Sequence, residues 1–164
     1  MVRAQVAPDA APCRGHSDYG YCLTIEGVLV RACRPQEISA VLELWQQARS
    51  EHATTVDQFD DVQRLLSQAA GSLLVADAGG VILGALIAAW DGWRGNMYRL
   101  AVRREHRRRG IALALVRAGE EHLCRQGASR ITALVAFEDE TAAAFWESAG
   151  YPQDREIGRR VRNL

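Results

Sequence analysis

Apolar and polar residues fall into a regular pattern only after Gly27. Residues 28–34 alternate in the way expected of a strand with one buried face. Pro35 interrupts that pattern, and beyond it apolar residues recur at the spacing of one helix face, at Ile38, Val41, Leu42 and Trp45. The pattern therefore predicts a strand followed directly by a helix.

The rest of the chain shows the same two periods in turn. Residues 72–90 read as two strands joined by a tight Ala-Gly-Gly turn. A helix that starts after residue 110 and stops at Gly127 carries Gly119 on its apolar face, which indicates a close approach to the sheet. The further elements expected are a helix over 58–70, a strand over 96–103, a strand over 130–137, a short helix with Ala142, Phe145, Trp146 and Ala149 on one face, and a last strand over 156–162.

The order of these elements indicates the fold class. It is strand, two helices, three strands, helix, strand, helix and short strand. A hairpin run followed by strand-helix-strand units implies a mixed sheet with helices on both faces, an α/β (α+β) fold. A chain of 164 residues, 48% of them hydrophobic, suits one domain. We expect that domain over residues 27–164, after a flexible extension over residues 1–26 that shows no periodicity.

Charge and composition exclude several classes of protein. Twenty basic residues balance twenty acidic ones, which argues against a surface built for nucleic acid or an anionic membrane. All the basic residues are arginine, so a lysine Schiff base and a lysine-bearing phosphate loop are excluded. The four cysteines form no CxxC pair and no zinc-like spacing with the four histidines, so no metal is expected.

Hydropathy bears on the location of the protein. The longest apolar run, from Val81 to Trp90, is about half of the ~20 residues needed to span a bilayer. The first 27 residues contain no apolar block of the kind that a secretion signal needs. We therefore expect a soluble, cytoplasmic protein.

The segment RREHRRRGIALAL, residues 103–115, holds the strongest local signal. Five arginines and a histidine precede an apolar helix, although the start of a helix favours acidic residues. Free backbone N–H groups at a helix start bind anions, most commonly phosphate. Gly110 and Ala112 would let a diphosphate approach the backbone, and its charge would make the arginines at 107–109 favourable. The alternative is a solvated loop, as for most charge runs.

Two motifs resemble the signatures of the GNAT superfamily of N-acyltransferases. LAVRREHRRRGIALALV is similar to its acetyl-coenzyme A signature, whose core Q/R-x-x-G-x-G/A corresponds to Arg107, Arg108, Arg109, Gly110, Ile111 and Ala112. FEDETAAAFWESAGY is similar to the second signature. The predicted order of elements also matches the family fold over about residues 27–164. The resemblance implies a mixed, mostly antiparallel twisted sheet of about six to seven strands, about four flanking helices and splayed central strands.

The same resemblance implies a site for acetyl-coenzyme A. The backbone amides of residues 109–112 would bind the diphosphate. In the triplet Leu100, Ala101 and Val102, the first and third residues would offer main-chain hydrogen bonds to the pantetheine arm and the thioester carbonyl, because the family's strand carries a bulge here. Polarising that carbonyl is often the largest catalytic effect. The second signature adds three residues at the cofactor: Asp139, which alternatively only caps its helix, and the aromatic pair Phe145 and Trp146.

One position departs from the family pattern. The family's usual general acid is the tyrosine of a sequence F-Y-E, and Trp146 occupies its place. An indole N–H cannot donate a proton to a leaving thiolate at neutral pH. Either Tyr98 or Tyr151 substitutes, or the thiol leaves unaided, since its pKa is near ~8.5 if it resembles cysteine. Leu134 stands where some relatives carry a glutamate base.

The acceptor side offers several candidates. Those for the general base are Glu51, His52, Asp91 and Glu138. The first two lie in a segment that lines the acceptor pocket in relatives. Trp90 and Trp93 would wall that pocket or stack on a cation, or they pack as an ordinary hairpin end. Nearby acids have a structural alternative, Asp57 as an N-cap and Asp60 and Asp61 as first-turn acids of the helix.

Three functions follow from these residues. The first is an N-acetyltransferase that moves the acetyl group of acetyl-coenzyme A to a primary amine of a small molecule or peptide, by direct attack in a ternary complex. The second is a catalytically weak acyl-coenzyme A-binding module, suggested by Trp146 and the missing base. Nucleic-acid binding is the third, and neutral overall charge disfavours it. As partners we expect an amine-bearing acceptor, but no nucleic acid and no membrane, and a monomer or homodimer.

Overall fold

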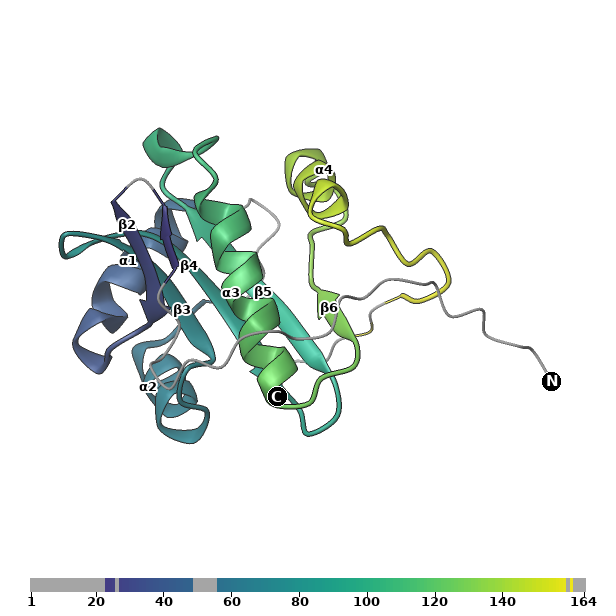
Figure 1. Cartoon of the computed structure of the whole chain (residues 1–164), viewed down its shortest axis with the longest axis horizontal. Helices are drawn as coiled ribbons and strands as arrows, with labels where there is room; N and C mark the ends of the chain where they lie inside the picture. Colours follow the sequence, from purple (N-terminus) through teal and green to yellow (C-terminus); the bar gives the residue numbers. More distant parts are fainter. Residues whose placement is uncertain (1–22, 26, 49–55, 159, 161–164) are drawn as a thin grey trace.

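The strands of the chain form one curled sheet. The computed structural model describes residues 23–25, 27–48, 56–158 and 160. Within them, six strands lie in chain order across the sheet (Figure 1). They are β1 (Leu23–Ile25), β2 (Val28–Ala32), β3 (Leu73–Ala78), β4 (Val81–Trp90), β5 (Gly95–Val102) and β6 (Ile131–Ala133). Neighbours are antiparallel except β5 and β6, which are parallel.

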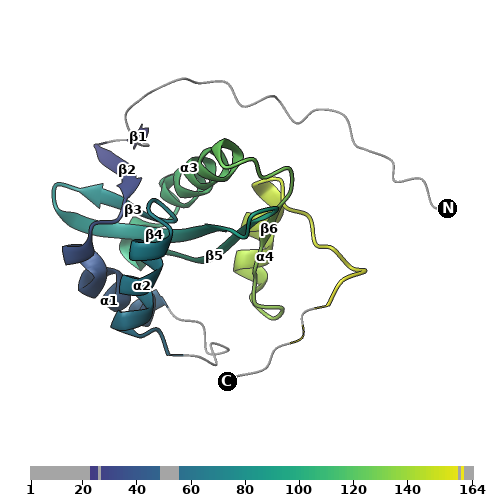
Figure 2. The same cartoon turned by 90° about the horizontal axis from the view of Figure 1, so that it is seen from below.

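Helices cover both faces of the sheet. They are α1 (Ile38–Ala48), α2 (Phe59–Gln68), α3 (Ile111–Arg125) and α4 (Glu140–Ser148), with 3-10 turns at Pro35–Glu37 and Arg104–His106. Figure 2 shows α1 and α2 on one side of the sheet and α3 on the other. This mixed, mostly antiparallel sheet with four described helices confirms the predicted fold class. No helix in the described part of the chain is long and apolar enough to cross a membrane.

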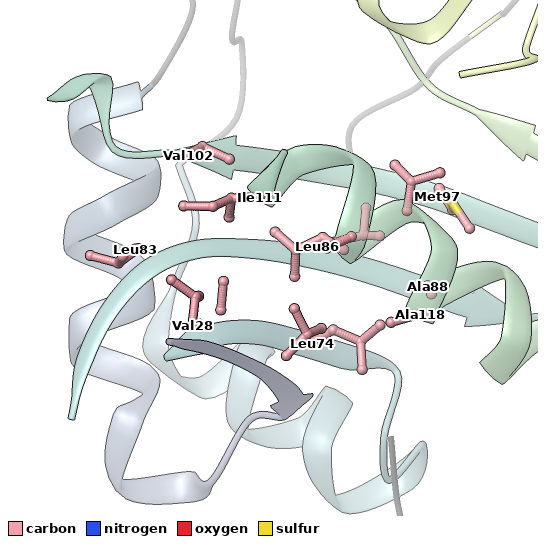
Figure 3. Close-up of a cluster of buried hydrophobic side chains, with 14 of the residues drawn as sticks. Val28, Leu74, Leu83, Leu86, Ala88, Met97, Val102, Ile111 and Ala118 are labelled. Atoms are coloured by element: carbon pink, nitrogen blue, oxygen red, sulfur yellow. The ribbon is translucent and has the colours of Figure 1, made fainter. Parts of the chain in front are cut away.

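The two sides of the sheet hold separate apolar clusters. On the α3 side, Leu86 and Met97 lie in one cluster of buried side chains (Figure 3). The same cluster includes Leu115 of α3 and Trp146 of α4. On the other side, α1 and α2 pack over a second cluster that includes Trp45. The predicted close approach at Gly119 is confirmed, because a Cβ there would lie 2.9 Å from the Met97 Cε atom.

The tight turn between β3 and β4 follows from its glycines. Gly79 and Gly80 have φ values of 62° and 95°, which suit a two-residue hairpin turn. The Asp77 carboxylate accepts a hydrogen bond from the Gly80 amide at 2.6 Å. The two glycines and Asp77 therefore form the tight turn that the Ala-Gly-Gly sequence predicted, and the turn pairs Ala78 with Val81.

Some element boundaries differ from those predicted. β1 lies inside residues 1–26, so the sheet begins at or before Leu23 instead of at Gly27; residues 1–22 lie outside the described part of the chain. β6 ends at Ala133, well before residue 137, because its pairing with β5 stops at Met97. The last strand predicted over 156–162 is absent from residues 156–158 and 160, the part of it that the structure describes.

Candidate active site

The centre of the site is an irregularity in β5. The pairing of β4 with β5 is regular up to Tyr98 and again from Ala101. Between those positions, Arg99 and Leu100 lie opposite a single residue of β4, which is a β-bulge. Arg99 has a φ of 57°, in the left-handed region that residues other than glycine seldom adopt.

The bulge changes which main-chain groups face β4. Before it, the Met97 carbonyl accepts a hydrogen bond from Leu134, on the β6 side, at 2.9 Å. After it, the Arg103 amide donates to the β4 side at 2.8 Å. Because the facing direction alternates along a strand, Leu100 and Val102 turn their main-chain groups away from β4. Without the bulge, the alternation would turn both toward β4.

Leu100 therefore faces a gap between two strands. β6 pairs with only three residues of β5, Gly95–Met97, and then ends. Beyond Met97 the two strands separate, which is the splay that the resemblance implied. The carbonyl of Val102 already accepts a hydrogen bond from Arg107 Nε at 3.1 Å, so on this side of β5 Leu100 offers the more open main-chain groups.

The start of α3 lies at the same end of the sheet. Gly110 is the N-cap, with a φ of 77° and no side-chain cap, and its carbonyl accepts the first helical bond, from Ala114, at 3.0 Å. The N–H groups of residues 111–113 precede that bond and are the free donors of a helix start. No acidic residue occupies the first turn. A Cβ on Gly110 would meet no atom within 4 Å, so open space borders these donors.

The predicted arginines surround this helix start. Arg107, Arg108 and Arg109 are exposed, and Arg108 has a φ of 63°. Arg109 Nη1 lies 3.4 Å from His106 Nδ1. Ile111 is buried under the helix, whereas Ala112 is half-buried beside the loop. The combination of free N–H groups and positive side chains is suited to a diphosphate.

The second signature forms the start of α4. Asp139 caps that helix, because its Oδ1 accepts a hydrogen bond from the Ala142 amide at 2.9 Å, as the capping alternative predicted. Trp146 is buried and packs edge-on against Phe145 and Tyr151, at centroid distances of 5.6 and 5.1 Å. These aromatic rings brace α4 against the α3 side of the core.

The two tyrosines considered as acids differ in their surroundings. The hydroxyl of Tyr151 donates to Glu120 Oε1 of α3 at 3.0 Å. Burial raises the pKa of Tyr151 strongly, and the Glu120 carboxylate adds to the rise. Tyr98 lies on the opposite face, half-buried against the α1 cluster, and burial raises its pKa. Each tyrosine therefore keeps its proton more firmly than a free phenol.

Three of the predicted acceptor residues lie at the other end of β5. Trp90 is the last residue of β4, and Asp91 and Trp93 belong to the turn between β4 and β5. Gly95, where β5 begins, is seven residues from Val102, which at ~3.3 Å per residue is roughly 23 Å. Hydrogen bonds from the Arg94 and Trp93 amides lower the pKa of Asp91 and tie its carboxylate to the turn. The structure does not bring these residues to the gap.

The remaining predicted residues divide into two groups. Glu138 is exposed in the connection from β6 to α4. Because β6 is parallel to β5, this connection leaves the sheet at the end where the gap opens. Glu51 and His52 lie outside the described residues. No cluster of three His, Cys, Asp or Glu residues in the described ranges could hold a metal ion.

Sequence reasoning missed three residues at the bulge. Trp45 Nε1 donates to the Arg99 carbonyl at 3.0 Å. Arg99 Nε donates to Asp57 Oδ1 at 2.7 Å. Asp57 is not the N-cap of α2, because that position belongs to Gln58. The available signal was the charge of Arg99 inside the apolar strand sequence MYRLAV, where an alternating pattern breaks.

Comparison with known proteins agrees with this geometry. The sequence model described as Acetyltransferase (GNAT) family matches residues 38–151. An acetyltransferase of Pectobacterium atrosepticum is 30% identical over 122 residues, which cover 74% of this chain and 86% of that protein. An aminoglycoside acetyltransferase from an uncultured soil metagenomic sample has a TM-score of 0.67 at 17% identity, over 84% of this chain and 97% of that one.

A further solved structure contains a coenzyme A derivative. It is AAC(6′)-Iy in complex with the bisubstrate analogue CoA-S-monomethyl-acetylneamine. Its TM-score is 0.64 at 20% identity, over 82% of this chain and 97% of that one. At these identities the two structural likenesses concern the fold. The family match covers more than half of the chain and includes both signatures, the bulge and the start of α3, so this chain belongs to the GNAT acetyltransferase family.

Proposed function

We propose that the chain is an acetyl-coenzyme A-dependent N-acetyltransferase that acts on a primary amine of a small molecule or peptide. One observation carries this proposal: the main chain of Leu100 and the uncapped start of α3 lie at the same end of β5, where Ile111 borders the β4 residue that pairs with Val102. A ligand with a diphosphate at one end and a carbonyl at the other would satisfy both sets of donors.

The residues present fit the diphosphate. The free N–H groups of residues 111–113 carry the positive end of the α3 dipole. Exposed arginines flank them, and no acidic residue in the first turn of α3 competes for the same donors. The open space beside Gly110 gives an anion access to the backbone.

The chain's own groups suggest how transfer would proceed. Acetyl-coenzyme A would supply the acetyl group as a thioester. The Leu100 N–H would donate to the carbonyl oxygen, where negative charge develops in the transition state. A positioned donor of this kind lowers the activation free energy by about 3 kcal/mol. With both substrates held together, the amine nitrogen would attack the thioester carbon and the C–S bond would break. Coenzyme A would leave as a thiolate, which takes a proton from solvent. Glu138, at the end of the sheet where the gap opens, would take the proton of the amine, directly or through water.

Relatives narrow the acceptors worth testing. Two proteins of the same fold are an aminoglycoside acetyltransferase and AAC(6′)-Iy bound to an acetylneamine analogue. Aminoglycosides, polyamines and peptides with free N-termini therefore form the first panel. Release of free thiol from acetyl-coenzyme A, with mass detection of the acetylated amine, measures turnover.

A matched pair of variants tests the cofactor site. Leu113 is exposed in the first turn of α3, and Leu113→Glu would place a carboxylate on the helix-start N–H groups. This change complements the helix dipole, so the fold should stay intact while acetyl-coenzyme A binds at least ~10-fold more weakly because like charges repel. Ser129→Glu adds the same charge beyond the far end of α3 and should leave binding unchanged. Equal effects from both variants would contradict the proposed site.

A second function, binding of an acyl-coenzyme A without turnover, has one specific observation in its favour. The hydroxyl of Tyr151 is held by Glu120, and Trp146 fills the family's acid position. Binding that disappears with Leu113→Glu, together with no thiol release for any amine in the panel, would select this function.

A further inference from the structure

Arg99 is an unusual residue to find at the centre of a bulge. A φ of 57° crowds the Cβ of any L-residue other than glycine, so the conformation persists only where the surroundings hold it. Most bulges of this shape carry glycine at that position. The contacts of Arg99 must therefore stabilise a backbone that its own side chain disfavours.

Within the part of the chain that the structure describes, Trp45 and Asp57 hydrogen-bond to Arg99 from the α1 and α2 side of the sheet. Trp45 Nε1 donates to the Arg99 carbonyl at 3.0 Å, which directs this carbonyl out of the sheet toward α1. Trp45 is itself buried, so its indole is fixed in position. The Arg99 side chain forms an ion pair with Asp57 at 2.7 Å, and both side chains are half-buried, 31% and 24% exposed. Asp57 stands just before α2.

The apolar core and these two contacts determine different features of the bulge: its presence and its backbone conformation. Leu100 and Val102 belong to the α3 side of the core and Ala101 to the α1 side, so burial alone requires one extra residue in β5. Burial does not select the dihedral angles of that residue. Contacts to its carbonyl and its side chain do select them, and with them the direction of the Leu100 N–H.

We propose that Trp45, Asp57 and Arg99 are positioning residues, which hold the bulge so that the Leu100 N–H points into the gap between β5 and β6. This role rests on the proposed function, in which that N–H polarises the thioester carbonyl. The three residues act through Leu100 and need not touch either substrate. They also link the segment before α2 to the reacting carbonyl, so a change at the start of α2 would alter the rate.

Arg99→Gly and Arg99→Ala form the sharpest pair of test variants. Both remove the ion pair, but glycine adopts a φ of 57° freely and alanine does not. We expect Arg99→Ala to lower kcat by about tenfold, a fraction of the effect of losing such a donor outright, and Arg99→Gly to lower it by about threefold. KM for acetyl-coenzyme A should change less than about twofold, because the start of α3 is untouched.

Trp45→Phe and Asp57→Ala test the two contacts separately. Trp45→Phe keeps an aromatic ring in the core and removes the N–H donor, so kcat should fall with little change in KM. Asp57→Ala combined with Arg99→Gly should lower kcat no more than the worse single variant, because the pair acts as one unit. Asp57→Asn retains a hydrogen-bond acceptor for Arg99, so its kcat should recover most of what Asp57→Ala loses.

A second readout does not depend on turnover. The backbone amide of Leu100 should shift in ¹H–¹⁵N spectra when acetyl-coenzyme A is added to the wild type, and this shift should be lost in Trp45→Phe. Equal kcat for Arg99→Gly and Arg99→Ala, or effects of the double variant that simply add, would overturn the positioning role. A wild type that neither binds acetyl-coenzyme A nor releases thiol would instead overturn the proposed function, and this role with it.

Discussion

At the scale of single residues, Gly110 and Gly92 have similar geometry and different surroundings. Their φ values are 77° and 96°, and a Cβ at either would meet no atom within 4 Å. Alanine at either position should therefore lower the free energy of unfolding by about 1 kcal/mol, through backbone strain alone. Only Gly110→Ala should also weaken acetyl-coenzyme A binding, by roughly tenfold, or 1.4 kcal/mol, because the methyl group borders the α3 donors. Urea titrations and calorimetric binding on both variants would separate these effects.

Gly92 lies in the turn before β5, at the far end of the sheet, which makes it the control. A comparable loss of affinity in Gly92→Ala would mean that lower stability, and not contact with the cofactor, reduces binding.

The raised pKa of Tyr151 predicts that the free energy of unfolding depends on pH in the alkaline range. Burial and Glu120 raise its pKa above the ordinary value of 10.0, so the native state keeps a proton that the unfolded state releases. This contribution to stability is complete below pH 10 and is lost as the pH rises above it. Tyr151→Phe should lose about 1–2 kcal/mol at pH 7, through the bond to Glu120. Its stability should then decline less steeply than that of the wild type above pH 10, as measured by denaturant titrations; parallel declines would contradict the assignment.

At the scale of elements, Arg31 links β2 to β3 and to the 3-10 turn at Pro35–Glu37 through two ion pairs. Arg31 of β2 contacts Glu37 at 2.6 Å and Asp77 of β3 at 2.7 Å, with all three side chains largely buried. The hydrogen bonds from Arg31 lower the pKa of both acids. The unfolded state then binds more protons, so this contribution is present above the ordinary values of about 4 and is lost as the pH falls through the lowered ones.

Arg31→Gln should therefore destabilise the protein in a pH-dependent way. At pH 7 we expect a loss of about 3 kcal/mol, because two carboxylates remain buried without their cation. The difference from the wild type should shrink as the pH falls below about 4 toward the lowered pKa values, because the stabilisation from the ion pairs is lost over this range. Arg64→Gln is the control, since its pair with Asp61 is 60% and 62% exposed and should contribute less than about 0.5 kcal/mol. A loss for Arg31→Gln that is the same at pH 7 and pH 3.5 would contradict this account.

Elements with their own local signals were predictable from sequence. The turn at Gly79 and Gly80 and the cap at Asp139 depend on residues a few positions away, and periodicity alone located α1 and α3. The end of β6 and the bulge depend on partners distant in the chain. Arg99 takes its conformation from Trp45 and Asp57, 54 and 42 residues earlier, and no local pattern contains such a pairing.

The residues of the candidate site also differ in whether a local sequence motif contains them. Both signatures are contiguous motifs, so the residues at the start of α3 and of α4 can be named from sequence, and their contact with the cofactor stays a prediction. The acceptor candidates around the turn before β5 rest on chemical type alone. Asp91 and Trp93 have suitable chemistry, yet the antiparallel course of β4 and β5 carries their turn to the opposite end of the sheet.

At the scale of the whole molecule, the gap couples ligand binding to global stability. The start of α3 and β5 belong to the same apolar cluster, so a ligand that binds only the folded state should stabilise the whole domain. At about 100 times its Kd, acetyl-coenzyme A should add about 2.7 kcal/mol, and a gain of this size should raise the Tm by roughly 5–10 °C.

Fragments of the ligand show where that stabilisation arises. ADP carries the diphosphate without the pantetheine arm, and pantetheine carries the arm without the diphosphate. If the free N–H groups and arginines at the start of α3 provide most of the affinity, millimolar ADP should raise the Tm and pantetheine should not. The ADP shift should also shrink between roughly 0.1 and 0.5 M salt, since the arginines are exposed and their charge is screened. A Tm that rises with pantetheine and is indifferent to ADP would place the affinity along β5, and would leave the arginines as an ordinary solvated loop.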